Sequence, residues 1–162
     1  MKKTFIITAI VIICILVSLV VLGKISQSGN AEGLLNGQLQ KCPDKPNCVC
    51  SELSDDSDHF TPPLVISGNS TREALKLLIE IIIELKGEVQ TVNETYVSAT
   101  FSSPLFEFVD DLEMRVDVAK NIIHIRSASR VGYSDFGANK KRVELIKKMF
   151  FARTSNGLCV DP

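Results

Sequence analysis

The chain has 162 residues, five cysteines and a formal net charge of −1. This length accommodates one membrane segment and one domain. A protein that binds a nucleic-acid backbone non-specifically usually carries a clear basic excess, so the charge balance excludes that class and no nucleic-acid partner is expected.

The first element is an uncharged run from Thr4 to Leu22 that is dominated by Ile, Val and Leu. At about 1.5 Å per residue, this run spans roughly 28 Å, which is close to the hydrocarbon core of a bilayer. Cleaved signal peptides have a shorter apolar core and a small-x-small cleavage site. We therefore expect residues 1–23 to form an uncleaved transmembrane anchor in the cell membrane. Lys2 and Lys3 favour a cytoplasmic N-terminus, with the remaining chain on the extracytoplasmic side.

Residues 24–40 are rich in Gly, Ser, Asn and Gln, which predicts a flexible tether between the anchor and a domain over residues 41–162. Four cysteines belong to this domain and suggest two disulfides in an oxidising compartment, with three connectivities open. We favour Cys42–Cys48, which closes the PDKPN loop, and Cys50–Cys159, which ties together the ends of the domain. The C-x5-C-x-C spacing matches neither a standard zinc site nor a thioredoxin-like C-x-x-C site. Neither a metal nor a cofactor is expected.

A helix is predicted from Ser70 to Leu85, because Ser70 and Glu73 have the spacing of a capping box and apolar residues follow at helical intervals. Gly87 is expected to take the left-handed position that ends this helix.

Four strands and a second helix follow. Residues 88–92 and 96–101 flank a short turn, residues 112–116 alternate apolar and charged side chains, and residues 122–129 form the last strand. The apolar pattern of the last two strands places Val116 opposite Ile123 and Glu113 opposite Arg126. Residues 138–152 have a helical apolar face. We predict an α+β fold: a four-stranded antiparallel meander with two helices packed on one face, preceded by a single transmembrane helix.

The densest polar chemistry lies between Arg126 and Arg142, where the last strand leads into the last helix. Guanidinium groups near free helix N–H groups are suited to binding an anion. The candidate ligand-binding residues are Arg126, Ser127, Ser129, Arg130, Tyr133, Ser134, Asp135, Asn139 and Arg142. Among them, Arg126, Arg130 and Arg142 are expected to hold the anion, with Tyr133, Ser134 and Asn139 shaping the pocket.

Two other interpretations remain open. Asp110, Asp111 and Glu113 are supporting carboxylates that can pair with the same arginines and form a purely structural scaffold. Alternatively, the segment belongs to a hydrolase that uses Asp135 or Asp111 with Ser129 or Ser134. The sequence has neither a G-x-S-x-G elbow nor an H-E-x-x-H metal motif, so the catalytic residues of such an enzyme are unknown.

CPDKPNCV, DDLEMRVD and IRSASRVGYSDFGANKKRVE occur in this order and closely resemble domain-of-unknown-function family 1499. The resemblance covers about residues 41–151. It implies no activity, but it implies the following signature positions: Cys42, Pro43, Pro46, Asn47, Cys48, Asp110, Asp111, Glu113, Arg126, Ser127, Ser129, Arg130, Tyr133, Ser134, Asp135, Asn139 and Arg142. Cys50 and Cys159 are additions to that pattern.

The leading hypothesis is a non-enzymatic, membrane-tethered module that binds an anionic small molecule or an envelope protein. The hydrolase and the arginine–carboxylate scaffold are the alternatives.

Overall fold

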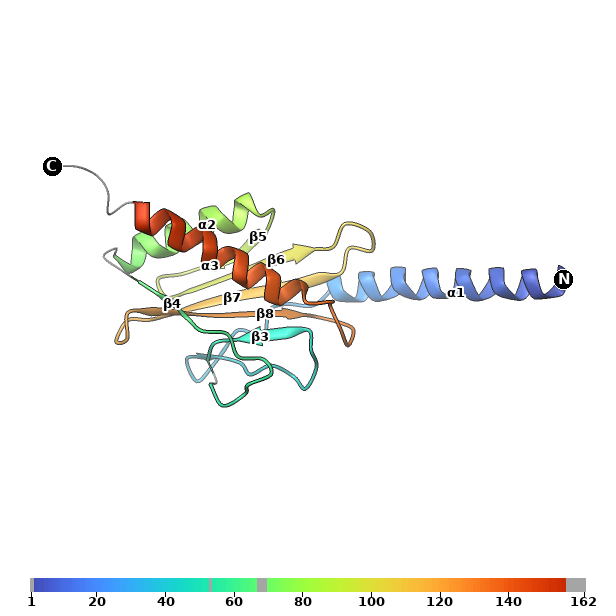
Figure 1. Cartoon of the computed structure of the whole chain (residues 1–162), viewed down its shortest axis with the longest axis horizontal. Helices are drawn as coiled ribbons and strands as arrows, with labels where there is room; N and C mark the ends of the chain where they lie inside the picture. The colour runs from blue at the N-terminus through green and yellow to red at the C-terminus, as the bar shows by residue number, and fades with distance from the viewer. Residues whose placement is uncertain (1, 53, 67–69, 157–162) are drawn as a thin grey trace.

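The computed structural model describes residues 2–52, 54–66 and 70–156 (Figure 1). The described chain is α+β, as expected, with antiparallel sheets and an apolar N-terminal helix. The helices are α1 (Lys2–Gln27), α2 (Thr71–Glu84) and α3 (Ala138–Asn156). The strands are β1 (Leu34–Leu35), β2 (Gln38–Leu39), β3 (Cys48–Cys50), β4 (Leu64–Val65), β5 (Glu88–Val92), β6 (Tyr96–Ser102), β7 (Val109–Asp117) and β8 (Ile122–Ser129).

The predicted meander is present, but the sheet is larger than predicted. Strands β5 to β8 pair in sequence order, and β3 and β4 both add to β8, which gives a six-stranded sheet. β3 pairs with the end of β8, and β4 pairs with its beginning. Strands β1 and β2 form a separate hairpin. The four-strand prediction was wrong because β3 and β4 are too short to show a periodic pattern, and their pairing partner is distant in sequence.

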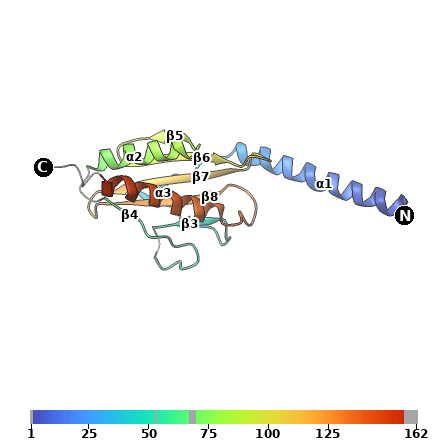
Figure 2. The ribbon, with the colours of Figure 1, turned by 45° about the horizontal axis from the view of Figure 1, so that its top comes forward.

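Helices α2 and α3 cover one face of the sheet (Figures 1 and 2). The predicted capping box of α2 is confirmed: Ser70 Oγ accepts from the Glu73 amide, and Glu73 accepts from the Ser70 amide. The predicted left-handed cap is wrong, since Lys86 adopts that conformation with φ of 65°. Gly87 is required for a different reason. A Cβ atom there would lie 2.6 Å from the ring of Phe101.

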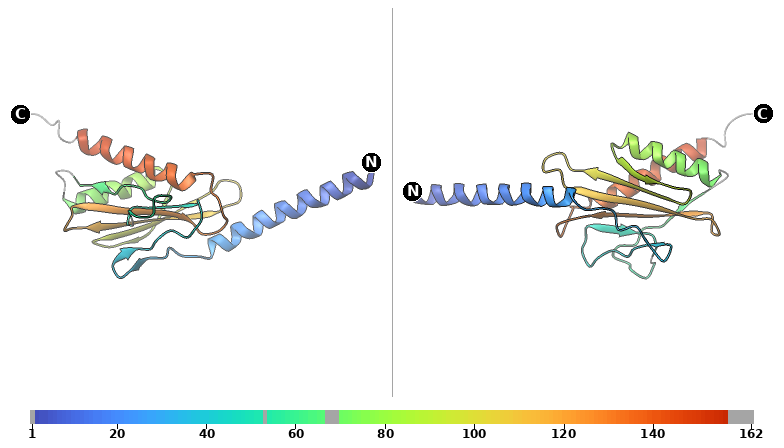
Figure 3. Two further views of the ribbon diagram at one scale, coloured as in Figure 1. Left: turned by 60° about the horizontal axis from the view of Figure 1, so that its bottom comes forward. Right: turned by 180° about the vertical axis from the view of Figure 1, so that it is seen from behind.

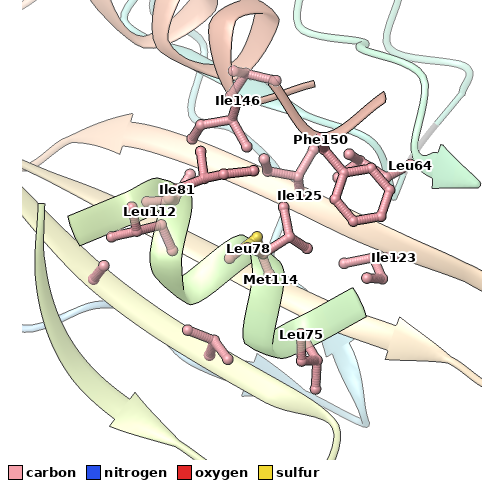
Figure 4. Close-up of a cluster of buried hydrophobic side chains, with 14 of the residues drawn as sticks. Leu64, Leu75, Leu78, Ile81, Leu112, Met114, Ile123, Ile125, Ile146 and Phe150 are labelled. Carbon is pink, nitrogen blue, oxygen red and sulfur yellow. The ribbon is translucent and has the colours of Figure 1, made fainter. Parts of the chain in front are cut away.

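The main core lies between these helices and the sheet (Figure 4). Alternate residues of β6, β7 and β8 point toward the helices, as the two-residue period of a strand requires. The fully buried members labelled in Figure 4 are Leu78, Ile81, Leu112, Met114, Ile123, Ile125 and Ile146, together with Leu64 and Phe150.

The predicted register of β7 and β8 is confirmed, with Val116 opposite Ile123 and Glu113 opposite Arg126. The face that carries the charges is nevertheless buried: Glu113 is fully inaccessible and Arg126 is 2% exposed. The β1–β2 hairpin lies on this side of the sheet, away from α2 and α3 (Figure 3). Residues 24–40, for which the sequence predicts a tether, thus contain the last turn of α1 and this hairpin.

Helix α1 is long and apolar enough to cross a membrane, a property that signal sequences share. It projects from one end of the sheet, and its last turn packs against the domain (Figure 1). The predicted Cys42–Cys48 disulfide is present, with the two Cα atoms 5.7 Å apart. Cys50 is buried on β3, and its predicted partner Cys159 lies outside the described residues.

Candidate functional site

The alternation of side chains along β7 and β8 divides the predicted site between the two faces of the sheet. Asp111, Glu113 and Arg126 lie on the face away from the helices, whereas Asp110 and Ser127 lie on the α3 side. The predicted residues therefore form two groups. Each group has its own set of hydrogen bonds.

On the α3 side, the buried amide of Asn139 links three segments of the chain. Its oxygen accepts two hydrogen bonds and its nitrogen lies within donating distance of three acceptors. The partners are Ser127 Oγ (2.5 Å) and Arg142 Nη1 (2.6 Å) as donors, and Asn47 O (3.1 Å), Ser129 Oγ (3.0 Å) and Asp135 Oδ2 (2.9 Å) as acceptors. Asn139 thereby fastens the start of α3 to β8 and to the CPDKPN loop.

Arg142 and Asp135 complete this group. Arg142 donates to Asp110 at 2.8 Å, and its guanidinium lies 4.5 Å from the ring centroid of Phe101. Asp135 Oδ2 accepts from the backbone amide of Asn139 at 2.7 Å and so caps the first turn of α3. The polar side chains of Asn139, Arg142 and Asp135 are therefore hydrogen-bonded to partners within the protein, which is the arrangement of a structural network.

On the opposite face, the Glu113 carboxylate is buried among donors. It accepts from Tyr96 Oη at 2.7 Å, from Arg126 Nη1 at 2.9 Å and from the Gly33 amide at 2.8 Å. Arg126 also pairs with Glu32, whose side chain is half exposed, at 3.2 Å. Burial and the hydrogen bond to Glu113 raise the pKa of Tyr96. The tyrosine therefore remains a neutral donor.

Arg130 connects this face to the end of α1. Its guanidinium makes two hydrogen bonds with Asp111, at 2.8 and 2.7 Å, and a third with the carbonyl of Ser26 at 3.1 Å. Ser26 Oγ in turn accepts from the Val109 amide at 3.1 Å. The last turn of α1 is consequently joined to both β7 and the segment that follows β8.

A polar cavity of about 350 Å³ lies on this face, between the residues after α1, the CPDKPN loop and the end of β8. It is lined by residues that include Glu32, Asn47, Asp111, Arg126, Ser129 and Arg130. Two buried atoms of these side chains, Arg126 Nε and Asn47 Oδ1, have no hydrogen-bond partner within the described residues. Each such atom costs about 1–3 kcal/mol when it remains unpaired.

The orientation of the Asn47 amide follows from its one side-chain hydrogen bond. Its nitrogen donates to the carbonyl of Gly132 at 3.2 Å, a contact that an amide oxygen cannot make. The unpaired atom of Asn47 is therefore an acceptor. The unpaired Arg126 Nε is a donor.

Tyr133 and Ser134 are exposed in the loop between β8 and α3. Ser134 Oγ accepts from the Phe136 amide, which is a local turn contact. Of the nine predicted ligand-binding residues, the cavity brings together Arg126, Ser129 and Arg130. Arg142 and Asn139 belong to the network on the other face.

A third buried polar group lies around His124, and the sequence interpretation did not single it out. Its Nδ1 lies 3.2 Å from Ser51 Oγ and 3.6 Å from Glu52. Glu52 makes two hydrogen bonds with Arg115. Both neighbours approach the same ring nitrogen and Ser51 is buried, so this trio lacks the geometry of a nucleophile, a base and an orienting carboxylate. Burial lowers the pKa of His124, with the Glu52 carboxylate opposing that effect.

A further cavity, of about 710 Å³, lies between α2 and the β5–β6 turn. Its walls include Leu75, Ile79 and Val92, and its exposed surface is mostly apolar. We regard the polar cavity as the candidate site because its walls hold buried charges and unpaired polar atoms, which give it chemical specificity.

Sequence reasoning assigned no ligand-binding role to Glu32 or Asn47, both of which line the cavity. Glu32 lies in the predicted tether, residues 24–40, whose composition gives no indication of a binding site. Asn47 lies in the CPDKPNCV motif, where its position between a proline and a disulfide-bonded cysteine indicated only a turn.

Comparisons with known proteins agree with the motifs. A search of curated proteins found no match to the chain. The family model described as "Protein of unknown function (DUF1499)" matches residues 38–150, which is more than two thirds of the chain and includes residues of all three motifs that line the cavity. The chain belongs to the DUF1499 family.

Proposed function

We propose that this protein is a membrane-anchored binding module that holds a small anionic ligand in the polar cavity beside Arg126. The observation that carries the proposal is a pair of buried atoms without a hydrogen-bond partner among the described residues, Arg126 Nε and Asn47 Oδ1, on two side chains that line the cavity. The large majority of buried polar side-chain atoms in folded proteins have a hydrogen-bond partner, so these atoms favour an external partner.

The charges of the cavity support an anion. Lys45, Arg126 and Arg130 contribute three positive charges to its walls, whereas Glu32 and Asp111 contribute two negative charges. Arg130 is paired with Asp111, and Arg126 is paired with Glu113 and Glu32. The exposed Lys45 is the cation of the wall that has no carboxylate partner among the described residues. A guanidinium presents its donors in a planar fork, so the free Nε of Arg126 is suited to a carboxylate or phosphate oxygen.

The two unpaired atoms also indicate which hydrogen-bonding groups the ligand carries. An acceptor on the ligand satisfies Arg126 Nε, and a donor satisfies Asn47 Oδ1. A carboxylate or a phosphate ester with an adjacent hydroxyl or amide group offers both an acceptor and a donor. The volume of about 350 Å³ lies at the small end of the range for ligand sites. We therefore favour a small molecule over an envelope protein as the occupant.

The contacts of α1 support retention of the helix as an anchor. Ser26 is buried, and it bonds to both Val109 and Arg130 of the domain. Removal of α1 with its last turn would leave these groups unpaired. We propose that Lys2 and Lys3 remain in the cytoplasm and that the domain lies outside it.

The α3-side network favours a second role for the family signature. Asn139, Arg142 and Asp110 are satisfied by one another, so we propose that this half of the signature is a scaffold that holds α3 on the sheet. The scaffold accounts for Arg142 but leaves the open donor of Arg126 unexplained. We thus assign Arg126 to ligand binding, and Asn139, Arg142 and Asp110 to the scaffold.

Ligand binding is tested with the full chain in detergent, by thermal unfolding with increasing phosphate and, separately, acetate. Glu32→Gln removes the half-exposed one of the two carboxylates that pair with Arg126, so affinity should increase. Lys45→Gln removes an exposed cation of the wall, and affinity should fall by up to about fivefold. Lys41→Gln is the matched control, since Lys41 is exposed in the same segment and should leave affinity unchanged.

Failure of both anions to stabilise either the wild-type protein or Glu32→Gln would contradict the proposal. The same conclusion would follow if Lys41→Gln and Lys45→Gln weakened binding equally, because a general surface charge would then account for the effect. Either outcome would leave the scaffold as the role of the whole signature.

A further inference from the structure

Two loops project from the same end of the sheet as α1 and flank its last turns (Figures 1 and 3). One is the β6–β7 loop, residues 103–108, and the other is the β8–α3 loop, residues 130–137. Each presents large apolar side chains to the outside, and these side chains line neither the cavity nor the core. An inference about these loops rests on the proposed anchoring of the chain by α1.

The β6–β7 loop lies level with the end of the apolar run of α1. The run ends at Leu22, and the next residue, Gly23, contacts the Phe106 backbone so closely that a Cβ atom would lie 2.0 Å from its carbonyl oxygen. Lys24 and Gln27 both bind the side chain of Glu107. The loop is therefore fixed at the height where a helix leaves the hydrocarbon core and enters the headgroup layer.

The β8–α3 loop is fixed to the same turn of α1. Its first residue, Arg130, donates to the Ser26 carbonyl, and the Arg130 amide donates to the carbonyl of Val109. Val109 in turn donates to Ser26 Oγ. Ser26 thus contacts the residue that follows the first loop, Val109, and the residue that begins the second, Arg130. The height of both loops relative to a bilayer is set by α1.

The side chains at this end are exposed. Leu105 is 78% exposed, Tyr133 69% and Phe136 92%. Phe136 also has φ of 55°, a left-handed conformation that is unfavourable for a bulky residue. Such strain persists where the surroundings impose it and is concentrated at functional sites. Within the part of the chain that the structure describes, the Phe136 ring is left almost uncovered.

We propose that the β6–β7 and β8–α3 loops insert Leu105, Tyr133 and Phe136 into the interfacial layer of the bilayer that α1 enters. Aromatic side chains favour this layer, because it accommodates an apolar ring and a polar neighbour together. The membrane is the favoured occupant because the covalently attached α1 brings it to the height of the loops. Lys140 and Lys141, exposed in the first turn of α3, follow Phe136 and are suited to lipid phosphates.

The consequence is a domain held in one orientation. Three contact points, α1 and two loops, define a plane, so the domain cannot swing freely on its anchor. The cavity is lined by Gly29 and Asn30, directly after α1, and by Arg130 at the start of one inserted loop. Its ligand would therefore be taken up close to the lipid headgroups.

The test uses the full chain reconstituted into phosphatidylcholine vesicles, because α1 keeps the chain membrane-bound whatever the loops do. The protein contains no tryptophan, so Phe136→Trp and Leu105→Trp each create a single fluorescent reporter. Val118→Trp is the matched control, in the exposed β7–β8 turn at the other end of the sheet. All three positions are exposed, so none of the substitutions disturbs the core.

Lipids brominated on their acyl chains should quench the tryptophan fluorescence of the Phe136→Trp and Leu105→Trp variants and leave that of Val118→Trp unquenched. Only the two loop variants should emit at shorter wavelength than tryptophan in water. Equal quenching in all three variants overturns the inference. A shifted emission without quenching also overturns it, because a protein neighbour or second copy then covers the loops. Extraction of the chain by alkaline washing overturns the anchoring as well, whereas retention without quenching overturns the loop insertion alone.

Discussion

Replacement of Glu113 by leucine tests the buried charge network most directly. Glu113 is fully buried and accepts from Arg126, Tyr96 and the Gly33 amide. The substitution leaves Arg126 buried with the half-exposed Glu32 as its remaining anionic partner. Removal of one member of a buried ion pair costs about 3–5 kcal/mol. Because Glu32 retains part of the attraction, we expect a loss of about 3–4 kcal/mol from the free energy of unfolding.

The measurement is urea unfolding of the full chain in micelles, followed by far-ultraviolet circular dichroism. On the proposed anchoring, α1 stays in the micelle and should contribute a constant signal. Glu113→Leu combined with Arg126→Met should recover much of the lost stability, because a well-packed apolar pair replaces a buried ion pair at little cost. Glu88→Leu, at an exposed position of β5, is the control and should change stability by no more than about 0.5 kcal/mol.

Two results would refute this reasoning. One is a loss below about 1 kcal/mol for Glu113→Leu, the size expected of a surface pair. The other is a double variant whose loss in the free energy of unfolding equals the sum of the losses of Glu113→Leu and Arg126→Met alone. Residues of one network should not contribute independently.

Three further predictions concern other parts of the domain. Cys42→Ser with Cys48→Ser opens a loop with a sequence separation of 6 residues and should lower the free energy of unfolding by about 2 kcal/mol, measured by urea unfolding. Gly87→Ala places a methyl group against the Phe101 ring and should cost about 1–3 kcal/mol in the same assay. Lys147→Met should stabilise the domain at neutral pH, because burial lowers the pKa of this amine to about 8. Below pH 8 the Lys147 amine is charged in the folded protein, and the full cost of burying this charge lowers the stability of the wild-type protein. This cost disappears as pH rises toward the ordinary lysine pKa of 10.5, so the stability gain of Lys147→Met should shrink between pH 8 and 10.5.

Each of these predictions has a clear contrary result. Equal stability of the wild-type protein with and without reductant would show that the disulfide contributes nothing. Unchanged unfolding of Gly87→Ala would mean that Phe101 moves aside freely. A stability gain for Lys147→Met that is independent of pH would attribute the effect to packing instead of to the charge.

The sequence by itself determined the elements whose signals are local. The capping box of Ser70 and Glu73, the alternation of β7 and the closing of a short loop by Cys42 and Cys48 all act over a few residues. Strand alternation also fixed the register of β7 on β8, because a shift by one residue would have buried charges against the helices. That register already placed Arg126 and Ser127 on opposite faces.

Only the tertiary structure decided where the charged face of the sheet lies. The sequence predicts a flexible tether over the β1–β2 hairpin and a disulfide-closed loop at CPDKPN. In the structure both segments lie against the charged face that carries Glu113 and Arg126. The docking of Ser26 against Val109 and Arg130 likewise joins residues about eighty or a hundred positions apart. Such contacts depend on long-range packing, for which a single sequence contains no local pattern. For this reason the cavity, its unpaired atoms and the height of the loops beside α1 became visible only in three dimensions.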